Sequence, residues 1–274
     1  MALLASVLIS VLAGAVVALG ASRLPRPGTP RVRAAAHVEP EVATGLALAL
    51  ALAIIVVGGL ILAVLTFAVR DADGGIGLDT SAGDWGAQHA TPFTTDVLKT
   101  LSHVGEPGSI AALAAVLAVI ETWRTRSRWV VPFLLLVVAG NGIVTTTIKN
   151  LVERVRPTLN PIAETLGPSF PSGHSSWSAA FFAAAALLLA RGRGRDTRIA
   201  LAGLAAGLAV AIASTRVLLG VHWLSDVVAG LAVGWAWFAA CAIAFGGRLM
   251  RFGAAAEVAG GGPGRPSALR RSGA

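Results

Sequence analysis

The stretch TGLALALALAIIVVGGLILAVLTFAV, residues 44–69, contains no charged side chain. About 20 apolar residues in a helix cross the hydrocarbon core of a bilayer, so this stretch is long enough to span it. The whole chain agrees, because 55% of its 274 residues are hydrophobic and only 13% are charged. We therefore expect an integral membrane protein of the all-α class, a polytopic bundle of transmembrane helices. The candidate spans are residues 2–21, 44–69, 109–123, 129–148, 174–190, 199–219 and 223–246.

Arginine-rich segments lie between these spans at every second connection. They are RLPRPGTPRVR (23–33), RTRSR (124–128) and RGRGRDTR (191–198). Cytoplasmic loops carry such an excess of cations, so the loops 70–108 and 149–173, which hold few, should face away from the cytoplasm. The same alternation places residues 216–222 on that outer side. The net charge of +8 then reflects orientation in the bilayer, and we expect no nucleic-acid partner.

The chain divides into three expected parts. Residues 44–246 hold six spans and form the predicted core, while residues 1–43 contribute an extra N-terminal helix and an arginine-rich cytoplasmic linker. The tail, 247–274, is rich in glycine and proline and is predicted to be disordered in the cytoplasm. Span 2–21 is compatible with a retained helix or with a cleaved signal segment. The absence of a basic segment before it favours the retained helix.

The remaining sequence gives fewer indications of structure or function. In the outer loop we expect only an interfacial helix around Val97, Leu98 and Leu101. The single cysteine, Cys241, cannot form an intrachain disulfide. The sequence shows neither a zinc-type Cys/His cluster nor a cluster of carboxylates, so we expect no metal and no other cofactor. The oligomeric state is left open.

The first polar motif is KNLVERVRP, residues 149–157, at the end of the fourth span. Lys149 and Arg156 could be ordinary anchors whose side chains reach the headgroups. Inserting ionisable groups at this depth of a membrane costs free energy, however, and such groups tend to be functional when other polar residues lie near them. Glu153 and Arg154 are expected to form a solvated helix edge.

The second motif is PSGH, residues 171–174, directly before an apolar run. Ser172 is a suitable N-cap, and Gly173 allows the backbone to approach a ligand closely. The free amides and the positive dipole end of the following helix would then form a seat for an anion, with His174 beside it. A capped helix start with an incidental histidine is the alternative.

The third motif is TRVLLGVHWLSD, residues 215–226. If the chain is helical from Gly220 onward, His222 and Asp226 lie one turn apart on the same face. The carboxylate could then fix the imidazole tautomer and leave the other ring nitrogen free to attack. A purely structural His/Asp pair is the alternative, although Arg216 in its apolar surroundings is harder to explain that way.

Together these motifs resemble the three signatures of the type 2 phosphatidic acid phosphatase (PAP2) superfamily, K-x6-R-P, P-S-G-H and S-R-x5-H-x3-D. They occur in the family's order, on one predicted membrane face, and the resemblance covers roughly residues 44–246. One position departs from the pattern, because Thr215 stands where serine is usual. Threonine keeps the hydroxyl, so we expect activity to be retained.

The resemblance implies a membrane phosphatase that works without a metal. His222, oriented by Asp226, would attack phosphorus and form a phosphohistidine, and His174 would protonate the leaving oxygen and then activate water. The implied phosphate-binding groups are those of Lys149, Arg156, Ser172, Gly173 and Arg216.

The expected substrate is a membrane lipid phosphate or diphosphate, cleaved at the extracytoplasmic face of a bacterial cell membrane. The family suggests undecaprenyl diphosphate, phosphatidate or phosphatidylglycerophosphate, with a slight preference for the first. Two alternatives stay open at this point. One is a phosphotransferase that uses the same site, and the other is a non-enzymatic lipid or anion carrier with Arg216 on its path.

Overall fold

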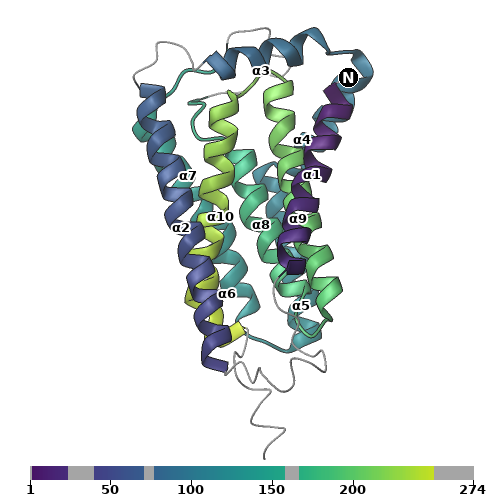
Figure 1. The fold of residues 1–274 in the computed structure, drawn as a ribbon, viewed down its shortest axis with the longest axis vertical. Coiled ribbons are helices and arrows are strands. Elements are labelled where there is room, and N and C mark those ends of the chain that lie inside the picture. The colour runs from purple at the N-terminus through teal and green to yellow at the C-terminus, as the bar shows by residue number, and fades with distance from the viewer. Residues whose placement is uncertain (1, 24–39, 71–76, 158–166, 250–274) are drawn as a thin grey trace, which may run out of the picture.

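The computed structural model describes residues 2–23, 40–70, 77–157 and 167–249, and every regular element within them is helical. The long helices form a bundle, and α3 lies across one end of it (Figure 1). The expected arginine-rich linker and C-terminal tail lie outside the described residues. The helices are α1 (Ala2–Arg23), α2 (Pro40–Arg70), α3 (Gly77–Gln88), α4 (Pro92–Val104), α5 (Pro107–Thr125), α6 (Val130–Leu135), α7 (Asn141–Val152), α8 (Gly173–Leu189), α9 (Arg195–Leu218) and α10 (Leu224–Leu249).

The predicted spans all appear as helices, which confirms the all-α transmembrane bundle. Among the described residues, five helical segments are long and apolar enough to cross a membrane. Two further apolar helical segments, Val7–Val17 and Gly173–Leu189, are shorter. The second of these is surrounded by other helices, so it needs less lipid-facing length than an outer helix.

The span predicted at 129–148 is interrupted rather than continuous. A π-helical turn, Leu136–Gly140, joins α6 to α7. Trp237 of α10 packs here, because its indole Nε1 donates to the carbonyl of Leu136 at 3.0 Å. A Cβ on Gly140 would lie only 2.4 Å from the Trp237 ring. The side chain of a neighbouring helix thus accounts for an irregularity that hydropathy could not predict.

The core lies between α5, α6, α8 and α10, around buried residues such as Phe133, Phe181 and Leu188. Two glycines of α10 let it pack directly against α8. A Cβ on Gly230 would lie 2.4 Å from the carbonyl oxygen of Ser172, and one on Gly234 would lie 2.3 Å from that of Ser176. Small residues four apart permit such backbone approach between helices in a bilayer. The first turns of α8 and α10 are therefore held side by side.

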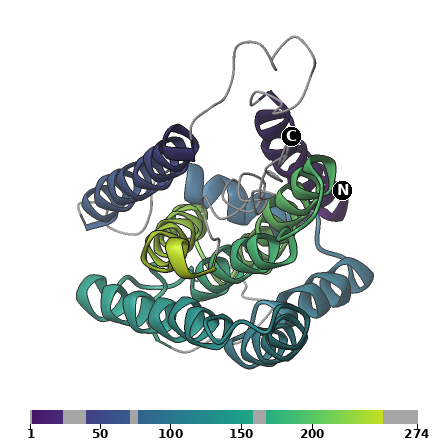
Figure 2. The same cartoon turned by 90° about the horizontal axis from the view of Figure 1, so that it is seen from below.

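Two helices lie on the outside of the bundle, α2 along α10 and α1 along α9 (Figure 2). The contact of α1 also depends on glycine, since a Cβ on Gly14 would lie 2.7 Å from the carbonyl oxygen of Gly203. The close approach of the two backbones explains how the alanine-rich helix α1 packs against α9.

The long outer loop contains two helices, where the sequence predicted one. The expected helix around Val97, Leu98 and Leu101 is α4, which is capped by Thr91. Leu98 is buried against Leu218 and Leu219 of the α9 end, so α4 covers the bundle. The additional helix α3 was not predicted, because its sequence GLDTSAGDWGAQ is rich in glycine and has weak helix propensity.

Candidate active site

The three polar motifs meet at the end of the bundle that α3 covers. The segment after α7 reaches the start of α10 through the contact of Arg156 with His222, whose nitrogens lie 3.3 Å apart. The start of α8 joins the same point, because the amide of Ser172 donates to the carbonyl of Asp226 at 2.9 Å. Segments as far as 66 residues apart in sequence therefore form one site.

His222 is held between a carboxylate and a guanidinium. Its Nδ1 lies 3.3 Å from Oδ2 of Asp226, and its Nε2 faces Arg156. Because the carboxylate only accepts and the guanidinium only donates, the ring carries its proton on Nδ1 and keeps a lone pair on Nε2. Burial lowers the pKa of His222 to about 4, so the imidazole is neutral at pH 7.

One detail of the third motif differs from the prediction. The helix begins at Leu224 rather than at Gly220, which has a left-handed φ of 69° in a tight turn. Asp226 Oδ2 accepts the amide of Trp223 at 3.0 Å, as the third residue of a capping box does. The expected pairing of His222 with Asp226 is present, but the turn and the cap position it.

The second motif forms the predicted helix start. Ser172 is the N-cap of α8, and its hydroxyl oxygen accepts the amide of Ser175. Gly173 is buried in the first turn, and a Cβ there would meet Trp177 at 3.6 Å, which is ordinary contact. Nε2 of His174 is buried and has no hydrogen-bond partner among the described residues. An unpaired imidazole nitrogen beside cations is suited to contact with an anionic ligand.

Three cations, those of Lys149, Arg156 and Arg216, lie near one another in this region. Lys149 Nζ donates to the carbonyl of Pro168 at 2.6 Å, and Arg156 Nε donates to that of Gly167 at 2.8 Å. Burial lowers the pKa of the Arg156 guanidinium from its usual high value. The charges of Arg156 and Arg216 both act on the imidazole of His174. All eight residues selected from the sequence therefore lie in one region.

Arg216 is anchored by a residue that the sequence did not suggest. Its side chain donates to the hydroxyl of Ser102 at 2.6 Å, while its Nε is buried without a partner in the described part of the chain. Ser102 is buried on α4, four residues after Leu98. No sequence pattern marks this serine, because the contact joins positions 114 residues apart.

The expected solvated edge at Glu153 and Arg154 is only half correct. Glu153 is exposed and ends α7 with a left-handed φ of 50°. The side chain of Arg154 is only 8% exposed and forms ion pairs with Asp226 at 2.6 Å and with Asp79 at 2.9 Å. The turn at Glu153 directs the next side chain inward, which explains the difference. Asp79, on the unpredicted α3, was also missed.

Neither of the other two described histidines is hydrogen-bonded to these eight residues. His89 contacts the carbonyl of Trp85, and His103 pairs with Glu106 on the surface. Within the described residues, no three His, Cys, Asp or Glu side chains are grouped as metal ligands would be. The region thus offers cations, helix-terminal amides and two imidazoles, a set suited to binding a phosphoryl group and transferring it.

Comparison with known proteins agrees with this geometry. Residues 129–249 match the sequence model of the PAP2 superfamily. The chain is 28% identical to phosphatidylglycerophosphatase B of Bacillus subtilis over 148 residues, covering 52% of this chain and 71% of the relative. It is 35% identical to decaprenylphosphoryl-5-phosphoribose phosphatase of Mycobacterium tuberculosis over 143 residues, covering 49% and 71%. Lipid A 1-phosphatase of Rhizobium johnstonii is 37% identical over 134 residues, covering 43% and 51%.

The fold is shared with a solved structure. A crystal structure of a transmembrane PAP2 type phosphatidylglycerolphosphate phosphatase from Bacillus subtilis superposes with a TM-score of 0.65 at 23% identity. The similarity covers 72% of this chain and 98% of that one. Sequence and fold agree, and this chain belongs to the PAP2 superfamily as an integral membrane phosphatase.

Proposed function

We propose that this protein hydrolyses a phosphate ester of a membrane lipid through a phosphohistidine on His222, without a metal ion. The observation that carries the proposal is the arrangement of His222. Its Nδ1 faces Asp226, and its Nε2 faces Arg156, which would bind the phosphate. A neutral imidazole with this tautomer is a competent nucleophile at pH 7.

The proposed reaction has two steps. Nε2 of His222 attacks phosphorus, the bond to the ester oxygen breaks, and His174 gives that oxygen its proton. His174 then accepts a proton from water, whose oxygen attacks the phosphohistidine and releases phosphate. Lys149, Arg156 and Arg216 stabilise the charge on the phosphoryl oxygens throughout, which is the main catalytic requirement.

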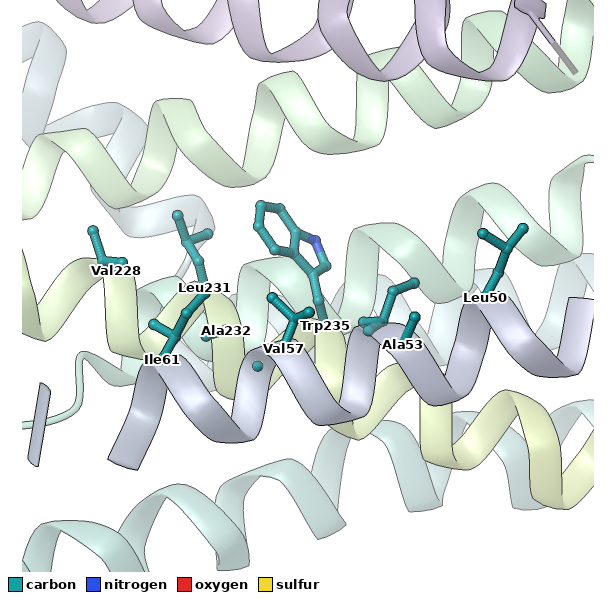
Figure 3. Close-up of a pocket in the computed structure, with 10 residues that line it drawn as sticks. Leu50, Ala53, Val57, Ile61, Val228, Leu231, Ala232 and Trp235 are labelled. Atoms are coloured by element: carbon teal, nitrogen blue, oxygen red, sulfur yellow. The ribbon is translucent and has the colours of Figure 1, made fainter. Parts of the chain in front are cut away.

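The lipid would enter with its tail between helices. A groove of about 430 Å³ between α2 and α10 is lined by apolar side chains, including Val57, Ile61 and Leu231 (Figure 3). It begins at Val228, two positions after Asp226, so it lies next to the catalytic end of α10. A second apolar groove of about 380 Å³ shares Val228 and Leu231 with the first. Acyl or prenyl chains fit such surfaces.

The relatives favour a terminal phosphate monoester as the substrate. Their names specify phosphatidylglycerophosphate, lipid A 1-phosphate and decaprenylphosphoryl-5-phosphoribose. A phosphate group on a large amphiphile is common to the three. We therefore place phosphatidylglycerophosphate and prenyl-linked sugar phosphates first, with phosphatidate and undecaprenyl diphosphate as the other substrates to compare.

We place this site at the extracytoplasmic face. The opposite end of the bundle carries the two described arginine-rich connections, 124–128 and 191–198. They meet there, because Arg124 donates to the carbonyls of Leu188 and Arg191. The positive-inside rule assigns that end to the cytoplasm.

The test is phosphate release by the detergent-purified protein from each of these lipids, in the presence of chelator. We expect release by the wild type, no release by His222→Ala, and wild-type rates for the control His89→Ala, whose ring contacts the carbonyl of Trp85 and stacks on its indole. Full activity of His222→Ala would refute the proposal. Release that requires an added lipid or sugar acceptor would instead identify a phosphotransferase.

A further inference from the structure

The carboxylate of Asp226 is fully buried and uses its two oxygens differently. Oδ2 accepts the amide of Trp223 and faces Nδ1 of His222. Oδ1 accepts a guanidinium nitrogen of Arg154 at 2.6 Å. The orientation of the carboxylate toward His222 is therefore fixed from its other side by Arg154.

Arg154 is itself held by α3. Its second guanidinium nitrogen donates to Asp79 Oδ2 at 2.9 Å. Asp79 is 2% exposed and also accepts the amide of Ser225 at 2.8 Å and the hydroxyl of Ser225 at 2.7 Å. That hydroxyl oxygen in turn accepts from Arg154 at 2.7 Å. The guanidinium also lies 5.4 Å from the centre of the Trp223 ring.

We infer that Asp79 and Arg154 are positioning residues that hold Asp226, and through it His222, in the geometry for attack. The outer helix α3 then contributes to the geometry of the active site through Asp79, in addition to packing over the end of the bundle. This inference rests on the proposed function, because it assumes that His222 is the nucleophile.

Electrostatics explains why both residues are needed. Arg154 places one positive charge between two buried carboxylates, which would otherwise repel each other. Asp79→Asn keeps the size of the side chain but leaves one acceptor oxygen for three donors, which come from Arg154 and Ser225. The Arg154 side chain could then change its position, and the Asp226 carboxylate that it binds would move with it.

Arg154 differs from Arg156 in what it touches. The polar contacts of Arg154 are with Asp79, Ser225 and Asp226, whereas Arg156 reaches His222 directly. Loss of a group that acts through His222, without contact to the phosphate, lowers kcat and leaves KM unchanged. Loss of a phosphate-binding group such as Arg156 would raise KM as well.

The experiment compares kcat and KM for phosphate release by purified full-length variants. A misplacement of about 1 Å costs on the order of 100-fold in rate, so we expect Asp79→Asn and Arg154→Gln to lower kcat about 10- to 100-fold with KM unchanged. The control Asp84→Asn removes the same charge from an exposed position of α3 and should match the wild type. Ser225→Ala is a milder change in the same hydrogen-bond network and should also lower kcat. It provides the test if Asp79→Asn does not fold.

A double variant separates positioning from general destabilisation. If Asp79 acts through Asp226, adding Asp79→Asn to Asp226→Asn causes no further loss of kcat. A wild-type kcat for Asp79→Asn, a rise in KM alone, or an equal further loss in the double variant would overturn the inference. If one of these results is found, the activity of His222→Ala shows what has failed. An inactive His222→Ala means that only the positioning role of Asp79 and Arg154 is wrong. An active His222→Ala means that the proposed function is wrong as well.

Discussion

Gly230→Ala should damage catalysis although the residue carries no side chain for chemistry. Gly230 lies one turn after Asp226 on α10, and its added Cβ would lie 2.4 Å from the carbonyl oxygen of Ser172 and 2.9 Å from Cβ of Ser175. The first of these is a backbone atom, so no rotamer change relieves the overlap. Ordinary contact begins near 3.4 Å, so the start of α8 must move about 1 Å from α10.

This displacement separates His174 on α8 from His222 and Asp226 at the start of α10. A misplacement of about 1 Å costs on the order of 100-fold in rate, so we expect kcat to fall by about that factor. The assay is phosphate release from phosphatidylglycerophosphate, with the melting temperature of each protein measured in parallel. The control is Gly59→Ala on α2, where an added Cβ meets nothing within 4 Å and the wild-type kcat should persist. A folded Gly230→Ala protein with wild-type kcat would refute the reasoning.

Other predictions concern the two histidines and the carboxylate. Asp226→Asn should lower kcat by about 100- to 10,000-fold, because the amide no longer fixes the tautomer of His222; a loss below tenfold in steady-state kinetics would contradict this. In a pH profile, kcat/KM should fall on the acid side near pH 4, where His222 becomes protonated. The alkaline limb should appear in kcat, as His174 loses the proton that the bound phosphate stabilises. A kcat that is flat from pH 5 to 9 would contradict the role of His174 as the acid, and a kcat/KM that does not fall below pH 5 would contradict attack by a neutral His222. EDTA in the phosphate-release assay should leave kcat unchanged. A loss of activity with EDTA that is reversed by added Mg²⁺ or Zn²⁺ would overturn the metal-free mechanism.

Hydropathy was sufficient to predict the spanning helices, and motif spacing was sufficient to select three polar motifs that meet in the structure. Long uncharged stretches such as 44–69 leave few alternatives to a spanning helix, and Ser172 with Gly173 marks a helix start by local chemistry alone. The positions of the arginine-rich loops brought three motifs to one end of the bundle. These signals are local, so a single sequence displays them directly.

The missed features depend on contacts between distant segments. Arg154 looked like a solvated residue at a helix end, and only its contact with Asp79, 75 positions earlier, shows why it is buried. Ser102 gains its role in the same way from Arg216. The π-helical turn at 136–140 needs Trp237 from α10, and the start of α10 at Leu224 needs the cap made by Asp226. No periodicity within the chain encodes such pairings.

The most direct test of the account is capture of the phosphoenzyme. Wild-type protein is mixed with a lipid labelled with ³²P in its terminal phosphate, quenched in alkali within one turnover, and digested for peptide mapping. We expect an acid-labile, alkali-stable label on the peptide that contains His222, at higher occupancy in His174→Ala, where water is no longer activated. A label on any other residue, or phosphate release by His222→Ala without a labelled enzyme, would contradict attack by His222.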